Sequence, residues 1–259
     1  MPNVLASSPM SFLRNSFSFG QKTWHDANRR LRTLEEDVKA RGEADFSGMA
    51  NGLRARLVEQ LELTDLPIDA DLRQHALPLG VAEVSASAYR SPKVRKIVMS
   101  HVLVGASRLP AIEGLALTVF PEYEWDLPCF AADFLAFPWS VSVHADVYGR
   151  EWQTQKVLSS LQHAFLRLGS GPGPVFCASL ASGDGLHARL RPRQMEEGFA
   201  ALLQALKAYL DLFADPPPGR SQSAQQEVFA VFHEAGPKKR LRRLFGEAFA
   251  ERYSRLLFE

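Results

Sequence analysis

The sequence predicts an α+β fold with a central antiparallel sheet, and the order of its hydrophobic patterns supports this. Helical periodicity fills the start of the chain, strand-like runs follow one another in the middle, and helical patterns return at the end. The 259 residues are 46% hydrophobic and 23% charged, which is typical of a globular protein that buries a core and a cavity. We expect an N-terminal arm over residues 1–20 and a single domain over residues 21–259.

Helices are expected where apolar residues recur every three or four positions. The first runs from Gln21 to Arg41 with charges on its other face, and the second from Phe46 to Leu61 with leucines at a spacing of four. Pro67 and Pro78 bracket irregular chain. The later helical patterns are Glu151–Leu168, Gln194–Phe213, Val228–His233 and Arg240–Leu257.

Strands are expected where short apolar or alternating runs are bounded by turn residues. These runs are Val81–Tyr89, Arg95–Val104, Leu115–Phe120, Cys129–Ala136 and Ser140–Val147, with a last hairpin of Val175–Leu180 and His187–Leu190. Because no helix separates the first five runs, neighbouring strands are expected to pair antiparallel.

Composition and charge exclude several classes of protein. Lys plus Arg number 30 against 29 for Asp plus Glu, and a net charge of +1 argues against a dedicated nucleic-acid binder. The chain has no apolar run of about 18 residues and no secretory signal at its N-terminus, so we expect no membrane span. Cys129 and Cys177 are too few for a disulfide framework, which favours a reducing cytoplasm.

Motifs for nucleotides and metals are also missing from the sequence. It has no Walker A loop and no dinucleotide-binding glycine pattern, and the glycine-rich stretch Gly169–Pro174 lacks a lysine and is interpreted as a loop. His144 and Asp146 would lie on one face of a strand, either as a metal-ligand pair or as a structural pair, and we favour the structural pair. We therefore expect no bound metal.

One segment resembles a known family. Residues 120–133 read Phe-Pro-Glu-Tyr-Glu-Trp-Asp-Leu-Pro-Cys-Phe-Ala-Ala-Asp, similar to the signature of the ferredoxin-dependent bilin reductases. There, a strand ends in Phe-Pro, and the next begins Leu-Pro-x-Phe-Gly-x-Asp. Pro121 and Pro128 match in spacing, Ala131 replaces the glycine, and Asp133 falls on the catalytic aspartate. Tyr89–Lys96 and Leu241–Tyr253 resemble further segments of the family in the same order.

The resemblance implies a three-layer α/β/α sandwich, with a bilin held between the central antiparallel sheet and the C-terminal helices. It implies reduction of a linear tetrapyrrole through bilin radicals, and biliverdin IXα is the substrate that we favour. It also implies reduced ferredoxin as the electron donor and no bound cofactor. The alternatives are an activity like that of red chlorophyll catabolite reductase, or a bilin-binding protein that has lost catalysis. We expect a monomer.

Asp133 is the acid that the resemblance singles out. Its apolar neighbours would raise the pKa of its carboxyl by desolvation and suit it to general acid catalysis. Ser100 and Ala116 stand where some family members have a catalytic glutamate and histidine, and we expect both positions to contact the substrate. His101 is one residue away, which points it to the other face of its strand.

The resemblance also concerns charged residues near the C-terminus. A second family aspartate is replaced by His233 and Glu234, which are either substitute proton donors or a solvated pair at a helix end. Arg167 matches an arginine that contacts the bilin, and its guanidinium suits a propionate. Lys239 or its neighbour Lys238 would take the place of a family lysine.

A basic run follows immediately, made of Lys238, Lys239, Arg240, Arg242 and Arg243. Because ferredoxins are acidic, this run is either a docking surface for the electron donor or a solvated helix face.

Overall fold

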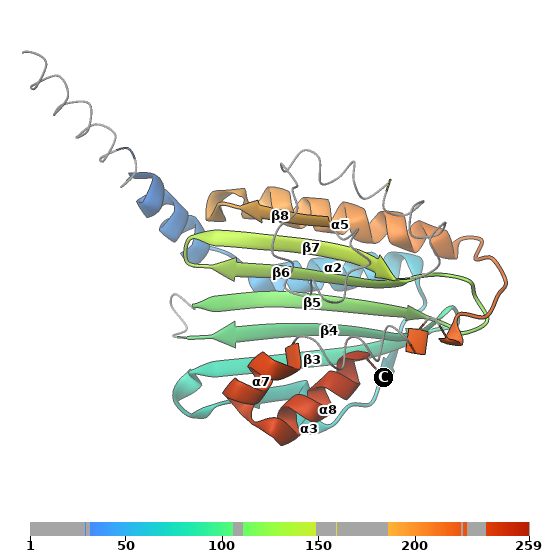
Figure 1. Ribbon diagram of the computed structural model, residues 1–259. Coiled ribbons are helices and arrows are strands. Elements are labelled where there is room, and N and C mark those ends of the chain that lie inside the picture. The colour runs from blue at the N-terminus through green and yellow to red at the C-terminus, as the bar shows by residue number, and fades with distance from the viewer. Residues whose placement is uncertain are drawn as a thin grey trace, which may run out of the picture.

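An antiparallel sheet forms the centre of the fold in a computed structural model that describes residues 29, 32–105, 111–148, 159, 186–223, 225–226 and 237–258. Its strand order is β1-β3-β4-β5-β6-β7-β8, and β2 also pairs with β3 (Figure 1). The strands are β1 (Thr64–Leu66), β2 (Gln74–Ala76), β3 (Ala82–Ser91), β4 (Val94–Val104), β5 (Ile112–Pro121), β6 (Cys129–Phe137), β7 (Ser140–Tyr148) and β8 (Leu186–Leu190).

One face of the sheet is covered by α2 (Phe46–Gln60) and α5 (Met195–Leu210). Asp45 caps α2 by accepting a hydrogen bond from the Gly48 backbone N–H at 2.8 Å. At Gly198 an added Cβ would lie 2.6 Å from the Leu190 side chain, so α5 needs a glycine there to approach β8 closely. This face holds the larger apolar core.

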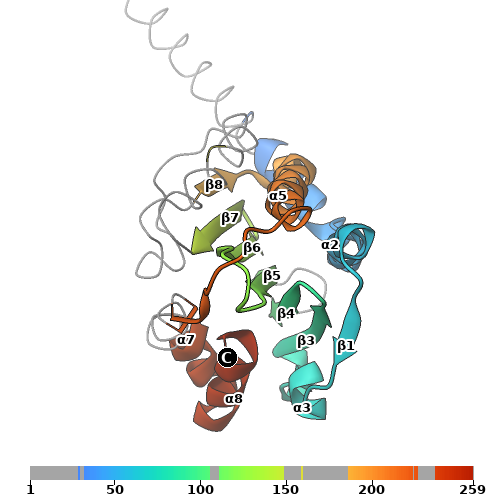
Figure 2. The ribbon, with the colours of Figure 1, turned by 90° about the vertical axis from the view of Figure 1, so that its right-hand side faces the viewer.

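The other face is covered by α7 (Pro237–Phe245) and α8 (Glu247–Phe258), with α3 (Ala70–Arg73) beside α8 (Figure 2). Thr118 on β5 donates a hydrogen bond to the Leu257 carbonyl of α8 at 3.3 Å, which identifies the side of the sheet that α8 covers. Gly246 separates the two helices with a φ of 87°, a conformation that favours glycine. The helical pattern predicted over Arg240–Leu257 is therefore two helices.

The predicted α+β sandwich is confirmed, and the five predicted central strands are present with bounds that differ from the prediction by at most three residues. The stretch between Pro67 and Pro78 differs from the prediction, because it contains α3 and β2 instead of irregular chain only. The helix predicted from Gln21 is present over residues 32–42.

Several predicted elements lie outside the described residues. These are the arm, the helices Glu151–Leu168 and Val228–His233, the Gly169–Pro174 loop and the strand Val175–Leu180. No helix in the described part of the chain is long and apolar enough to cross a membrane.

Candidate functional site

A row of directly paired residues crosses the sheet at the middle of its strands. From β3 to β8 the row is Ala86, Ser100, Ala116, Asp133, His144 and His187. Side chains of directly paired residues point to the same face of a sheet. Thr118 is two residues from Ala116 and bonds α8, so the whole row faces the layer of α7 and α8.

The alternation of β6 sets the direction of Asp133. Phe130, Ala132 and Phe134 are buried in the core beneath α2 and α5, so the residue between the last two must point to the other face. The Asp133 side chain keeps 23% of its surface exposed. Burial of the rest raises the pKa of its carboxyl from 3.8 to about 6. A carboxyl of this kind both gives up and regains a proton near neutral pH.

The exposed part of the row lies in its middle. Ala116 is half-buried like Asp133, whereas Ser100 and His144 on either side are 5% and 3% exposed. The methyl group of Ala116 also leaves space where a larger side chain would stand. The accessible surface on this row is therefore centred on the Asp133 carboxyl.

Tyr253 reaches the row from α8 and was missed by the sequence analysis as a site residue. Its phenol lies beside the Ser100 hydroxyl and within electrostatic range of Asp133. Burial raises the pKa of the phenol above its ordinary value, so it stays protonated and can donate a hydrogen bond. Helix packing brings Tyr253 to Ser100 from a distant part of the chain, which no local pattern signals.

Two histidines continue the row beyond Asp133. The Nδ1 atom of His144 lies 3.9 Å from Oδ2 of Asp133. Burial and the neighbouring His187 lower the pKa of His144 from 6.5 to about 4. Burial and Arg189 also lower the pKa of His187, whose Nε2 lies 2.8 Å from the Ser142 hydroxyl oxygen. The His144 imidazole is therefore neutral at neutral pH.

A structural role was predicted for His144 from the sequence, yet the short turn between β6 and β7 already places it opposite Asp133. Phe137 pairs with Ser140 across a two-residue turn. Counting back four residues on β6 and forward four on β7 pairs Asp133 with His144. Asp146 lies on the same face, fully buried, and its Oδ1 accepts a hydrogen bond from the Val147 backbone N–H at 2.8 Å.

His101 lies on the opposite face, as the shift of one residue predicts. Its Nε2 is 3.1 Å from Glu113, which also pairs with the buried guanidinium of Arg41 at 3.1 Å. Burial alone would raise the pKa of Glu113, but His101 and Arg41 together hold it below its ordinary value. The imidazole of His101 thus belongs with Glu113 and Arg41 to a polar cluster on the α2 side and does not face Asp133.

Several residues of the signature segment hold the loop between β5 and β6 in place. Arg95 lies over the rings of Phe120 and Tyr123, at 5.2 and 4.9 Å, and its Nε donates to Gln225 at 3.0 Å. Gln225 in turn donates to the Pro121 carbonyl at 3.0 Å. The loop is thereby attached to the linker that follows α5.

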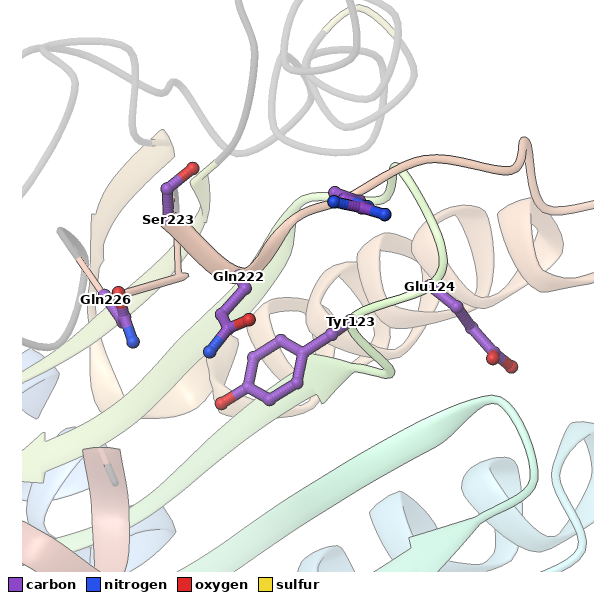
Figure 3. A pocket seen from close by; sticks show the side chains of 6 residues that line it. Tyr123, Glu124, Gln222, Ser223 and Gln226 are labelled. Atoms are coloured by element: carbon purple, nitrogen blue, oxygen red, sulfur yellow. The ribbon is translucent and has the colours of Figure 1, made fainter.

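A hollow of about 650 Å³ lies at this junction, within the size range of ligand pockets. It is lined by Tyr123, Glu124, Arg220, Gln222, Ser223 and Gln226 (Figure 3). Asp133 does not line this hollow. It lies within β6, four residues beyond Cys129, where the strand begins. Arg220 contributes a cation to a lining that is otherwise polar or acidic.

Other predicted site residues lie outside the described part of the structure. These are Arg167, His233 and Glu234, and the side chains of Lys238, Lys239 and Arg240, whose backbone belongs to α7. Arg242 donates to Glu247 at 2.8 Å, so its charge is shared within the helix pair, whereas Arg243 is exposed. Within the described residues no group of three or more metal-ligating side chains occurs.

Comparison with known proteins identifies the family. The model of the family described as ferredoxin-dependent bilin reductase matches residues 50–259. A curated phycoerythrobilin:ferredoxin oxidoreductase from Gloeobacter violaceus is 31% identical over 219 residues, covering 76% of this chain and 87% of the relative. The chain belongs to the ferredoxin-dependent bilin reductases.

As a ferredoxin-dependent bilin oxidoreductase, the protein takes electrons from reduced ferredoxin and reduces a bilin. Among solved structures, phytochromobilin synthase from tomato in complex with biliverdin has a TM-score of 0.65 at 18% identity, over 82% of this chain and 84% of that one. This likeness shows that the two chains share the bilin reductase fold.

Proposed function

We propose that the protein reduces biliverdin IXα through bilin radicals and that Asp133 supplies a proton to the reduced substrate. The observation that supports this is the position of Asp133, 23% exposed at the middle of the row and with burial that raises its pKa to about 6. The solved complex of tomato phytochromobilin synthase with biliverdin supports this choice of bilin.

Two electrons and two protons are consumed for each double bond that is reduced. Ferredoxin delivers the electrons one at a time, so a one-electron-reduced bilin is formed first and is more basic than biliverdin. Asp133 then transfers its proton to this radical and becomes a carboxylate. The Tyr253 phenol, within electrostatic range of Asp133, and the Ser100 hydroxyl beside that phenol hold a polar edge of the bilin by hydrogen bonds. Ala116 leaves room for the flat tetrapyrrole.

The remaining predicted residues complete the proposal. Arg167 and Lys239 bind the propionates, because a carboxylate that leaves water needs a cationic partner. His233 and Glu234 are the nearest replacements for the family's second aspartate and are proposed as donors to a second position. Lys238, Lys239, Arg240, Arg242 and Arg243 form the proposed docking surface for ferredoxin. The family match over residues 50–259 supports a single catalytic domain within residues 21–259.

Asp133→Asn tests this proposal. Asparagine keeps the size of the side chain but has no proton to give, so biliverdin should bind, the first electron should arrive, and the bilin radical should accumulate. We expect the turnover rate to fall by about two to four orders of magnitude. Absorption and electron paramagnetic resonance spectra during anaerobic reduction measure both quantities.

Three outcomes would contradict the proposal. Full turnover by Asp133→Asn would move the acid role to His233 or Glu234. A wild-type protein that binds biliverdin without any change on adding reduced ferredoxin would be a bilin-binding protein without catalysis. Reduction of red chlorophyll catabolite, but not of biliverdin, would assign the alternative substrate.

A further inference from the structure

We propose that His144 and His187 form a relay that returns a proton to Asp133 after its first proton transfer, and this rests on the proposed role of Asp133. His144 is the positioning residue in this relay, since it acts on the substrate only through the aspartate. His187 and Ser142 continue the relay toward β8, the outermost described strand on that side of the sheet.

The need for such a relay follows from the residues on the row. Reduction of one double bond consumes two protons, and a carboxyl group carries one. The other side chains of the row on β3, β4 and β5 are Ala86, Ser100 and Ala116, and none of them is an acid. Whether or not a second donor acts elsewhere, Asp133 becomes a carboxylate when it gives its proton and must be protonated again before it can give another.

His144 is the titratable residue best placed to protonate Asp133 again. Its Nδ1 lies 3.9 Å from Oδ2 of Asp133, so an approach of about 1 Å completes a hydrogen bond. Neither ring nitrogen of His144 has a hydrogen-bond partner among the described residues, although the ring is 3% exposed. Buried polar atoms are normally paired. A purely structural role leaves these unpaired nitrogens unexplained, whereas a relay needs one nitrogen toward Asp133 and the other free to accept.

The surroundings of His144 favour the neutral imidazole that a relay uses. His187 is its direct partner on β8, and Arg189 acts on His187 from the same strand. Asp133 faces it from β6, Asp146 and Ser142 lie on β7 itself, and Tyr253 approaches Asp133 from α8. Neutral imidazole carries one N–H donor and one acceptor nitrogen.

The step balances without any change of oxidation state. The Nδ1–H of His144 passes its proton to the Asp133 carboxylate, and a new O–H bond forms as the N–H bond breaks. In the same step, as the two rings approach, Nε2 of His144 takes a proton from its cross-strand partner His187, and Nε2 of His187 recovers one from the solvent through Ser142. The net change is one solvent proton moved to Asp133, with each histidine neutral in its other tautomer. Proton exchange restores the starting tautomers before the next turnover.

The test compares His144→Gln with wild type in a single turnover, with biliverdin and reduced ferredoxin mixed anaerobically. We expect the bilin radical to form at the wild-type rate and then to decay at a rate lower by about 10-fold or more, with biliverdin affinity unchanged. His187→Gln should slow the same step by a smaller factor. The matched control is His101→Gln, which changes a histidine of β4 on the opposite face of the sheet and should leave the decay rate unaltered.

A second measurement needs no substrate and keeps the relay separate from the proposed function. Carbon NMR of protein labelled in its aspartate carboxyls reports the titration of Asp133, and His144→Gln should shift that titration while His101→Gln should not. If wild type fails to reduce biliverdin, the proposed function is wrong and this titration still decides whether the two side chains are coupled. The relay is refuted if the titration is unmoved, if the radical decays at the wild-type rate, or if radical formation and decay slow by the same factor. If His144→Gln does not fold, the same measurements on His187→Gln decide.

Discussion

Replacing Asp133 by asparagine is expected to make the folded protein more stable at neutral pH, although it removes the proposed proton donor. Burial raises the pKa of this carboxyl from 3.8 to about 6. The folded state therefore holds the carboxylate less favourably than the unfolded chain does. A gap of this size corresponds to about 3 kcal/mol. Because 23% of the side chain is exposed, solvent screens part of this, and we expect about 1–3 kcal/mol.

The pH window follows from the direction of this pKa change. Between 3.8 and about 6 the folded state binds the proton and the unfolded state releases it, so wild-type stability falls as pH rises through this window. Above it the whole penalty is present, and below it both states are protonated and the penalty is absent. Asparagine cannot ionise, so the variant escapes the penalty and its advantage over wild type should appear only as pH rises.

Urea-induced unfolding of wild type and Asp133→Asn at about pH 7.5 and about pH 4 measures this difference. The advantage of the variant should be largest at the higher pH and small at the lower. An equal difference at both pH values would mean that ionisation of Asp133 is not its origin. A variant less stable than wild type at about pH 7.5 would refute the argument that this carboxyl is strained by burial.

Three further predictions concern charged residues elsewhere. Glu113 has a lowered pKa, so its ionised form contributes to folding stability at neutral pH, and this contribution is lost in acid. Urea unfolding of Glu113→Gln should therefore show a loss of stability at neutral pH that shrinks in acid. Arg167→Ala should weaken biliverdin binding by about 1–3 kcal/mol in an absorption titration, and unchanged affinity would remove it from the propionate site. Neutralising Arg240 and Arg243 together should slow turnover at low salt and flatten its salt dependence without altering bilin affinity, and an unaltered salt profile would favour a solvated helix face.

Asp133 could be identified from sequence through the resemblance of residues 120–133 to the family signature, because β6 is apolar on both faces around it. Once Phe130, Ala132 and Phe134 enter the core, the alternation of the strand fixes the direction of the aspartate. The same local rule correctly placed Ser100 and His101 on opposite faces of β4. The pairing of the central strands was equally predictable, because short connections without helices join them.

The neighbours of Asp133 were harder to predict, because they depend on contacts between distant segments. Tyr253 reaches Ser100 only after α8 packs on the sheet, and α8 takes its direction from the turn at Gly246. His187 joins the row through the pairing of β7 with β8, which is set by the chain between them and not by either strand alone. His144 was the exception, since the turn after Phe137 already fixes its register.

Asp133 has one direct neighbour in the row on either side, Ala116 on β5 and His144 on β7. An imidazole therefore stands on one side of the aspartate and only a methyl group on the other. Ala116 is half-buried like Asp133, whereas His144 is 3% exposed. In our proposal the substrate therefore meets the carboxyl directly, and the histidine acts on the reaction only through that carboxyl.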